Sequence, residues 1–303
     1  MKKVLKNIFI KIRIYDVFRF LRLKLKRNKY LDKNILNSYD QLKLKKKKNN
    51  SVIIWSTHKS ASTLINRTIG LLKKNSIYHH HDIETNISRM AQKYQFKIDK
   101  PINLLKEFPE LFFKKFGYIY GPIRQPVKIT NYQEYKNIFI LRDPRDVLVS
   151  FYYWIIDGRK HSSLHKATAA YNKKRKEKFI KIGIDNYCIE YVDSWICPTY
   201  NFYKDIYDNS LYKKVYYYHD IILDKSKLVN DLKNILNLKN FNSEELNNLF
   251  DIVLIKKKSN NSLHIRSGKS SQFKKELSQK TIDLLNLKLY KVFKDWPGLD
   301  STK

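Results

Sequence analysis

The stretch that decides the fold is NIFILRDPRDVLVS at residues 137–150. Its first five residues are rich in apolar side chains and predict a buried strand at Asn137–Leu141. Asp143 and Pro144 are typical of the cap and the first turn of a helix, which Asp146 supports. Apolar residues then continue to Trp154. The stretch therefore predicts a strand that turns directly into a helix, with charged residues at the turn.

The same order of strand, polar turn and helix occurs earlier in the chain. Val52–Trp55 predicts a strand, Ser56–Thr63 a polar turn, and the spacing of apolar residues from Leu64 to Leu72 a helix. Further strands are expected at Ile77–His80, Tyr118–Tyr120 and Lys214–Tyr218, and further helices at Leu228–Leu238, Ser243–Ile255 and Leu277–Phe293. This alternation predicts one α/β domain at residues 49–303, with a mainly parallel sheet flanked by helices. Ligands of such sheets bind at the carboxyl ends of the strands.

Composition excludes several classes of protein. The 303 residues include 43% hydrophobic and 14% aromatic residues, which is too many for a disordered chain. Two cysteines are too few for a disulfide scaffold and fit a reducing compartment. No apolar run approaches the ~20 residues of a membrane-spanning helix. We therefore expect a cytoplasmic globular protein, whose net charge of +33 favours anionic partners.

The positive charge is concentrated in residues 1–48, which hold 17 Lys and Arg against three Asp. Apolar residues spaced by three and four predict a basic amphipathic helix there, followed by a linker at Lys45–Lys48. Two roles remain open for this helix: residues 1–30 contact an anionic membrane surface, or the helix packs on the domain. With the basic tract Lys173–Lys178, the segment also allows an alternative function, a nucleic-acid or membrane binding protein without catalysis. No nucleic-acid motif is present, so we expect no nucleic-acid partner.

Polar residues at the predicted strand ends suit phosphate groups. Backbone N–H groups at a helix start, several hydroxyls and Lys59 together form an anion-binding turn after the first strand. The turn lacks the Gly-Lys-Ser/Thr of a P-loop, which disfavours a nucleotide kinase. Arg142 follows the fourth strand, and Ser150 lies eight residues further on. A third basic segment, Arg266–Lys274, precedes the last predicted helix.

These three segments together resemble the sulfotransferases that use 3′-phosphoadenosine 5′-phosphosulfate (PAPS) as donor. Ser56–Leu64 resembles their 5′-phosphosulfate loop, Arg142–Ser150 is a close match to their 3′-phosphate motif, and Arg266–Lys274 is similar to their C-terminal loop. The segments stand in the family's order and spacing, and the resemblance covers about residues 51–295. It implies a P-loop NTPase-like sulfotransferase fold. It also implies in-line transfer of a sulfuryl group from PAPS to an acceptor hydroxyl or amine, without a metal.

The resemblance also implies a role for each matching residue. Lys59 is expected to contact the bridging oxygen of the phosphosulfate as a catalytic residue. The residues expected to bind the donor are Lys59, Ser60, Ala61, Ser62 and Thr63 at the 5′-phosphate, Arg142, Ser150, Arg266, Ser267 and Gly268 at the 3′-phosphate, and Tyr218 and Phe273 near the adenine. Ala61 replaces the family's usual Gly, which the turn accepts if φ is negative there. Leu64 replaces a Trp that stacks on adenine in the cytosolic branch.

The general base and the acceptor are less well defined. Many cytosolic members carry a His in the segment that here reads Tyr118–Arg124, which has none. His79-His-His-Asp82 follows the second strand, and we expect His81 or Asp82 to act as the base, unless the run is only a polar strand end. No third ligand accompanies this run, so no metal is expected. The acceptor wall is expected from residues 83–116 and 155–200 and from the aromatic residues Trp154, Trp195, Tyr152 and Tyr153. Glycan, lipid-linked and small-molecule acceptors remain open.

Overall fold

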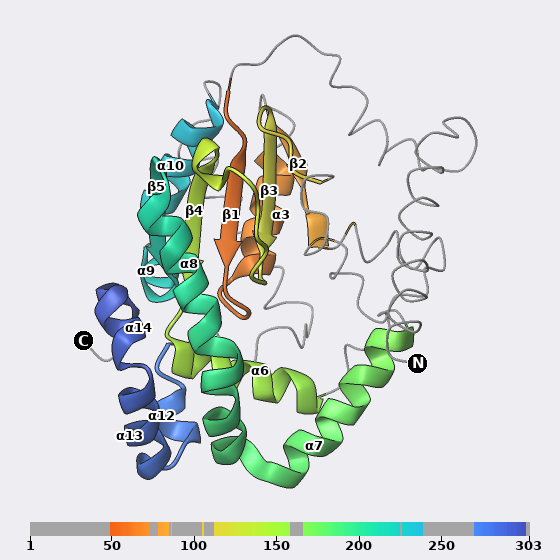
Figure 1. The fold of residues 1–303 in the computed structure, drawn as a ribbon, viewed down its shortest axis with the longest axis vertical. Helices are drawn as coiled ribbons and strands as arrows, with labels where there is room; N and C mark the ends of the chain where they lie inside the picture. Colours follow the sequence, from red (N-terminus) through yellow and green to blue (C-terminus); the bar gives the residue numbers. More distant parts are fainter. Residues whose placement is uncertain are drawn as a thin grey trace, which may run out of the picture. The chain divides into compact units, whose positions relative to one another are not determined.

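A five-stranded, fully parallel sheet forms the centre of the fold (Figure 1). The strands lie in the order β2-β3-β1-β4-β5. Their bounds are β1 Val52–Ser56, β2 His79–His81, β3 Tyr118–Ile123, β4 Lys136–Leu141 and β5 Tyr212–Tyr217. All five predicted strands are present, with ends shifted by up to three residues. The sheet and its flanking helices confirm the predicted fold class.

The computed structural model describes residues 49–72, 78–84, 86, 105, 112–157, 166–224, 226–238 and 270–300. All of these belong to one compact unit. The predicted N-terminal helix, the predicted helix at Ser243–Ile255 and the predicted binding residues Arg266, Ser267 and Gly268 lie outside the described residues.

The helices of the described chain connect and cover the strands. Their bounds are α3 Ser62–Leu72, η4 Tyr132–Glu134, α6 Pro144–Asp157, α7 Lys166–Tyr191, η5 Val192–Ile196, α8 Cys197–Asn209, α9 Tyr218–Leu223, α10 Ser226–Leu236, α12 Phe273–Glu276, α13 Gln279–Lys288, α14 Tyr290–Asp295 and η6 Pro297–Leu299. Among them, none has the length and apolar character needed to cross a bilayer.

The predicted helix Leu277–Phe293 is wrong as a single element. Ser278 caps the start of α13, where its side chain accepts a hydrogen bond from the backbone N–H of Thr281. The helix then breaks at Leu289, whose N–H reaches back to the carbonyls of Leu285 and Leu287. The apolar spacing continues through this break, so the pattern of side chains alone does not reveal it.

Alternate residues of β1 face the two sides of the sheet. Val52 and Ile54 belong to an apolar core that includes residues of α3 and α10. On the opposite face, the Trp55 ring lies 5.8 Å from that of Tyr203 on α8. In the view of Figure 1, α8 crosses in front of the strands and α3 lies behind them. The central strand β1 is therefore buried on both faces, as expected for parallel strands.

Strand β3 continues through Gly121-Pro122, where the sequence predicts its end. Gly121 has φ +109°, and a Cβ at this position would lie 2.5 Å from the carbonyl oxygen of Ile54 on β1. Only glycine fits such a close approach of two strands. Glycine and proline usually mark turns, and here they instead carry β3 to the sheet edge where the functional residues gather.

Candidate active site

A tight loop leads from the carboxyl end of β1 into α3. The N–H of Thr57 donates to the carbonyl of Ile140 on β4 at 3.3 Å, and the hydroxyls of Thr57 and Ser60 hydrogen-bond to each other. Lys59 and Ala61 both adopt the left-handed conformation, with φ of 65° and 59°. Ser60 is fully buried, so the loop presents its backbone and Lys59 rather than the Ser60 hydroxyl.

The positive φ of Ala61 corrects the sequence expectation. Alanine was expected to replace glycine at this position at no cost if φ is negative, but φ at Ala61 is 59°. In the left-handed region a side chain with a Cβ costs about 1 kcal/mol relative to glycine. The loop therefore keeps the conformation that a glycine would favour, and Ala61 bears the strain.

Arg142 joins three strand ends. Its Nη1 donates to the carbonyl of Lys59 at 2.9 Å, and its Nη2 lies 3.4 Å from the Asp146 carboxylate. The guanidinium also lies 4.3 Å from the ring centre of Tyr218, which begins α9 directly after β5. Residues predicted as a set from separate segments thus meet in one place, at the carboxyl ends of β1, β4 and β5.

One face of α6 runs along this junction. Asp146, Ser150 and Trp154 are spaced by four residues and so lie on the same side of the helix. Asp146 contacts Arg142 at one end, and the Trp154 ring lies 5.8 Å from Lys59 Nζ at the other. Ser150 is partly exposed between these two contacts. The predicted 3′-phosphate residues and the predicted catalytic lysine therefore border one helix face.

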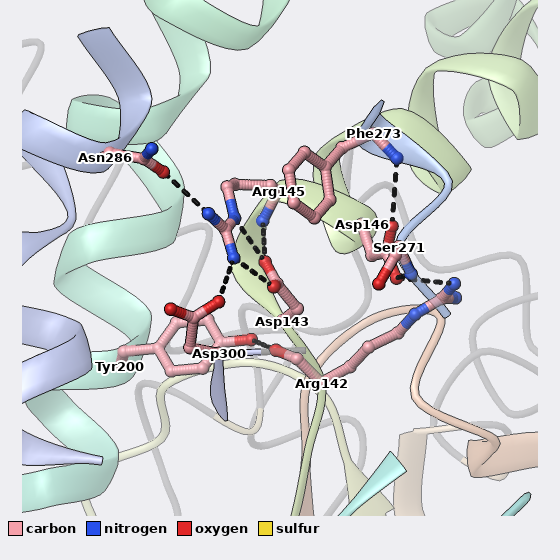
Figure 2. A network of polar contacts seen from close by, with 9 residues as sticks. All are labelled: Arg142, Asp143, Arg145, Asp146, Tyr200, Ser271, Phe273, Asn286 and Asp300. Atoms are coloured by element: carbon pink, nitrogen blue, oxygen red, sulfur yellow. Dashed lines mark hydrogen bonds and ion pairs between the residues drawn. The ribbon is translucent and has the colours of Figure 1, made fainter. Parts of the chain in front are cut away.

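Asp146 also binds the C-terminal part of the third basic segment, Arg266–Lys274. Its carboxylate accepts the backbone N–H groups of Ser271 at 2.8 Å and Phe273 at 3.2 Å, as Figure 2 shows. Burial, aided by the charge of Asp143, raises the pKa of Asp146, although Arg142 and the two backbone hydrogen bonds act in the opposite direction. The sequence identified Asp146 only as support for the first turn of α6, because its partners lie about 125 residues away in the chain.

Phe273 does not occupy the place expected for it. Its side chain is 1% exposed, and the Arg145 guanidinium lies 4.0 Å from the centre of its ring. The ring therefore belongs to the core and has no exposed face for a nucleotide base. Arg145 in turn binds Asp143, Asn286 and Asp300, which fastens the C-terminal helices to the start of α6 (Figure 2).

The two predicted bases differ in access. His81 is 2% exposed, and its ring contacts those of Tyr118 and Tyr120. Burial, with a contribution from His80, lowers the pKa of His81 to about 4. Asp82 is partly exposed, and one carboxylate oxygen accepts a hydrogen bond from Asn66 of α3 at 2.6 Å. Within the described ranges, no group of three or more His, Cys, Asp or Glu is arranged to hold a metal ion.

His58, which sequence reasoning missed, extends the site beyond Lys59. Its imidazole lies edge-on to the rings of Phe151 and Trp195, with centres 5.4 and 5.6 Å away. Burial, followed by the charges of Arg124, Lys59 and Arg175, lowers the pKa of His58 to about 3. The imidazole is therefore neutral among these cations. Its position inside the predicted anion-binding loop was the available signal.

A partly buried ion pair lies beside this histidine at the ends of β2 and β3. Glu84, which is 8% exposed, accepts the backbone N–H and the Nε–H of Arg124, each at 2.7 Å. Asp82 contributes to the field at Arg124. The pairing of Glu84 with Arg124 joins residues 40 apart, and no local pattern in the sequence indicates it.

The aromatic residues predicted for the acceptor wall fall into two groups. Trp154 and Trp195 are partly exposed and lie next to Lys59 and His58 respectively. Tyr152 is 8% exposed and packs in the core. The Tyr153 hydroxyl is 2.5 Å from the Glu276 carboxylate. Trp195 lies in η5, a π-helical turn of a kind frequent at functional sites.

Comparison with known proteins matches this chain to one family model and to solved structures. A family model described as "Sulfotransferase family" matches residues 43–293. The crystal structure of mouse sulfotransferase SULT7A1 complexed with PAP is similar, with a TM-score of 0.50 and 14% identity over 82% of this chain and 85% of that one. Retinol dehydratase in complex with androsterone and the inactive cofactor PAP gives a TM-score of 0.49 and 13% identity over 81% of each chain. No curated protein sequence matches this chain significantly.

Proposed function

This chain belongs to the sulfotransferase family, and we propose that the carboxyl ends of β1, β4 and β5 hold PAPS while its sulfuryl group passes to an acceptor hydroxyl. One observation carries the assignment. Arg142 binds the carbonyl of Lys59 and stacks on Tyr218, so that the predicted donor-binding residues of three separate loops border one site. The similar mouse sulfotransferase contains PAP, the product that PAPS leaves after transfer.

The donor's phosphates match the positive and N–H-rich parts of this site. The start of α3 directs free backbone N–H groups toward a 5′-phosphate, and the exposed hydroxyl of Thr63 lies beside them. Arg142 and Ser150 hold the 3′-phosphate through a charge-assisted contact and a hydroxyl donor. Tyr218, whose ring covers the guanidinium of Arg142, borders the adenine. Arg266, Ser267 and Gly268 complete the 3′-phosphate site in this proposal.

In the chemical step, the acceptor oxygen attacks the sulfur in line with the bridging oxygen. The new S–O bond forms as the bond to the bridging oxygen breaks, and the electron pair remains on the 5′-phosphate of the departing PAP. Lys59 offsets the negative charge that develops on this oxygen. The nearby ring of Trp154 limits the positions of the flexible Lys59 side chain.

A base must accept the proton of the acceptor hydroxyl. Asp82 serves this role better than His81, because Asp82 is partly exposed and His81 is enclosed by the tyrosines of β3. The hydrogen bond from Asn66 fixes one oxygen of Asp82 at the entrance of the site. We place the whole catalytic domain at residues 49–303, with residues 1–48 as an extension that binds anionic membrane or packs on the domain.

Transfer from ³⁵S-labelled PAPS to a panel of glycan, lipid-linked and small-molecule acceptors tests this function. The wild type should label at least one acceptor class. Lys59→Ala should lower turnover about 100-fold or more, the scale of losing one transition-state donor, and should retain PAP binding. Lys204→Ala is a matched control, because it removes a lysine paired with Asp208 on the surface of α8. Equal turnover of wild type and Lys59→Ala would refute the assigned role.

A further inference from the structure

Arg175 on α7 has an unusual environment for a guanidinium. Its Cζ lies 4.9 Å from the ring centre of Phe151, 5.3 Å from that of Phe179 and 5.4 Å from that of Tyr171. Its Nε is buried and has no hydrogen-bond partner. Arg175 also belongs to the basic tract Lys173–Lys178, to which the donor site assigns no role.

The other arginine side chains that the structure describes are paired with acids. Arg124 binds Glu84, Arg142 binds Asp146, and Arg145 binds both Asp143 and Asp300. Within the described part of the chain, Arg175 alone of the four forms no ion pair. A cation partly removed from water without a counter-charge is costly, although the three rings offset part of that cost. The arrangement is completed when an anion from outside the chain reaches the guanidinium.

A row of aromatic rings connects Arg175 with the reacting end of the donor site. Phe151 lies under Arg175 and 5.3 Å from the ring of Trp154, which in turn contacts Lys59 Nζ. The Trp195 ring lies 4.8 Å from that of Phe151 on the side of His58. Phe151 itself is 5% exposed, whereas Trp154 and Trp195 on either side of it are partly exposed. An acceptor whose hydroxyl approaches Lys59 can therefore contact these two tryptophans and extend toward Arg175.

Two irregularities of the backbone position the residues of this aromatic row. Gly183 interrupts α7 with φ 74° and ψ 167°, and the π-helical turn η5 begins nine residues later, at Val192. These irregularities bring Arg175 and Trp195, 20 residues apart, to the same ring of Phe151. Continuous helix would not return the chain to this point.

We propose that the acceptor carries an anionic group, a carboxylate or a sulfate, and that Arg175 binds this group while the acceptor hydroxyl is presented near Lys59. The inference rests on the proposed sulfotransferase function and specifies its substrate class. Arg175 acts in this account as a residue of substrate specificity, and it takes no part in breaking or forming bonds. Its guanidinium can bind either anion with two parallel N–H donors.

Matched acceptors that differ only in the anionic group provide the test. One pair is 4-hydroxyphenylacetate and its methyl ester, and the other is a glucuronate-containing oligosaccharide and its carboxyl-reduced form. Sulfuryl transfer from labelled PAPS is measured for wild type, Arg175→Gln and the control Lys174→Gln, which removes an exposed charge from the same tract. Binding of each acceptor to the PAP-loaded protein is measured in parallel, so that a result does not depend on turnover.

The wild type should prefer the anionic member of a pair. Arg175→Gln should raise KM for the anionic acceptor about 10- to 100-fold, the range of a charge-assisted contact, and leave kcat and the neutral acceptor nearly unchanged. Lys174→Gln should retain the preference, and Arg175→Lys should retain part of it, which separates loss of the contact from misfolding. An unchanged preference in Arg175→Gln, or a wild-type preference for the neutral members, overturns the inference. If neutral acceptors are still sulfated in that case, the proposed function stands without it; if the protein neither binds PAP nor transfers sulfuryl groups, both fail.

Discussion

Replacement of His81 by Asn should flatten the dependence of stability on pH. His81 is 2% exposed, and its pKa is lowered to about 4 in the folded chain, whereas an unfolded chain has a histidine pKa of about 6.5. Above pH 6.5 both states are neutral, and the imidazole contributes its full share of stability. As the pH falls from 7 to 5, His81 is protonated in the unfolded chain but stays neutral in the folded chain, so that stability is lost. At pH 5 the pH lies about 1.5 units below the pKa of the unfolded state, so that the free energy of unfolding falls by about 2 kcal/mol.

Urea unfolding at pH 7 and pH 5 measures this loss. An asparagine amide can occupy the position of His81 Nδ1, which contacts the Asn86 side chain at 3.3 Å, and it does not titrate. The variant should be less stable than wild type at pH 7, because a buried ring is removed. Between pH 7 and pH 5 it should lose about 2 kcal/mol less free energy of unfolding than wild type.

His79→Asn is the matched control, since His79 lies on the same strand and is partly exposed. It should show the wild-type dependence on pH more closely than His81→Asn does. Identical pH dependence in wild type and His81→Asn would contradict the buried, neutral state of His81. That result would also restore His81 as a base with a pKa near neutrality.

Two further substitutions test the architecture of the site. Ala61→Gly should raise the free energy of unfolding by about 1 kcal/mol, because glycine adopts the observed φ of 59° without strain; a clear decrease in the urea midpoint would refute this account of the loop. Tyr203→Phe should lower the free energy of unfolding by about 1 to 2 kcal/mol, because the single proton of the Tyr203 hydroxyl is shared between the carbonyls of Ser56, at 3.0 Å, and Ile123, at 3.3 Å, at the ends of β1 and β3. Thermal unfolding with no measurable change would show that these carbonyls do not need the hydroxyl.

The sequence predicts the elements of this fold more reliably than their contacts. Apolar runs followed by polar turns identify β1, β3 and β4, because burial of a parallel strand on both faces leaves a strong local pattern. The edge strands β2 and β5 are also predicted, although most of their residues are only partly buried. The cap at Asp143 is likewise local: its carboxylate accepts the N–H of Arg145 two residues later. Where backbone geometry departs from side-chain pattern, as at Gly121 and Leu289, prediction of the element ends is wrong.

The candidate site likewise contains residues that a local sequence pattern predicts and contacts that it does not predict. Lys59 and Arg142 could be identified from motifs, because helix starts and strand ends constrain the residue types nearby. The hydrogen bonds that Asp146 accepts from Ser271 and Phe273 join distant segments, as does the one that Glu84 accepts from Arg124. No local sequence pattern indicates these contacts. Phe273 shows the reverse case, in which a position within a motif is used for packing against Arg145. Three-dimensional structure is needed to separate these roles.

We propose that Arg142 makes the site specific for a nucleotide with a 3′-phosphate. Isothermal titration with PAP and with adenosine 5′-monophosphate, which lacks that phosphate, tests it most directly. The wild type should bind PAP at least about tenfold more tightly than the monophosphate, the scale of one charge-assisted contact. Arg142→Met, which keeps an apolar stem against Tyr218, should lose most of this preference, and the remainder is expected from Ser150 and the Arg266–Gly268 segment. Equal affinities in the wild type, or an unchanged preference in Arg142→Met, would contradict the account.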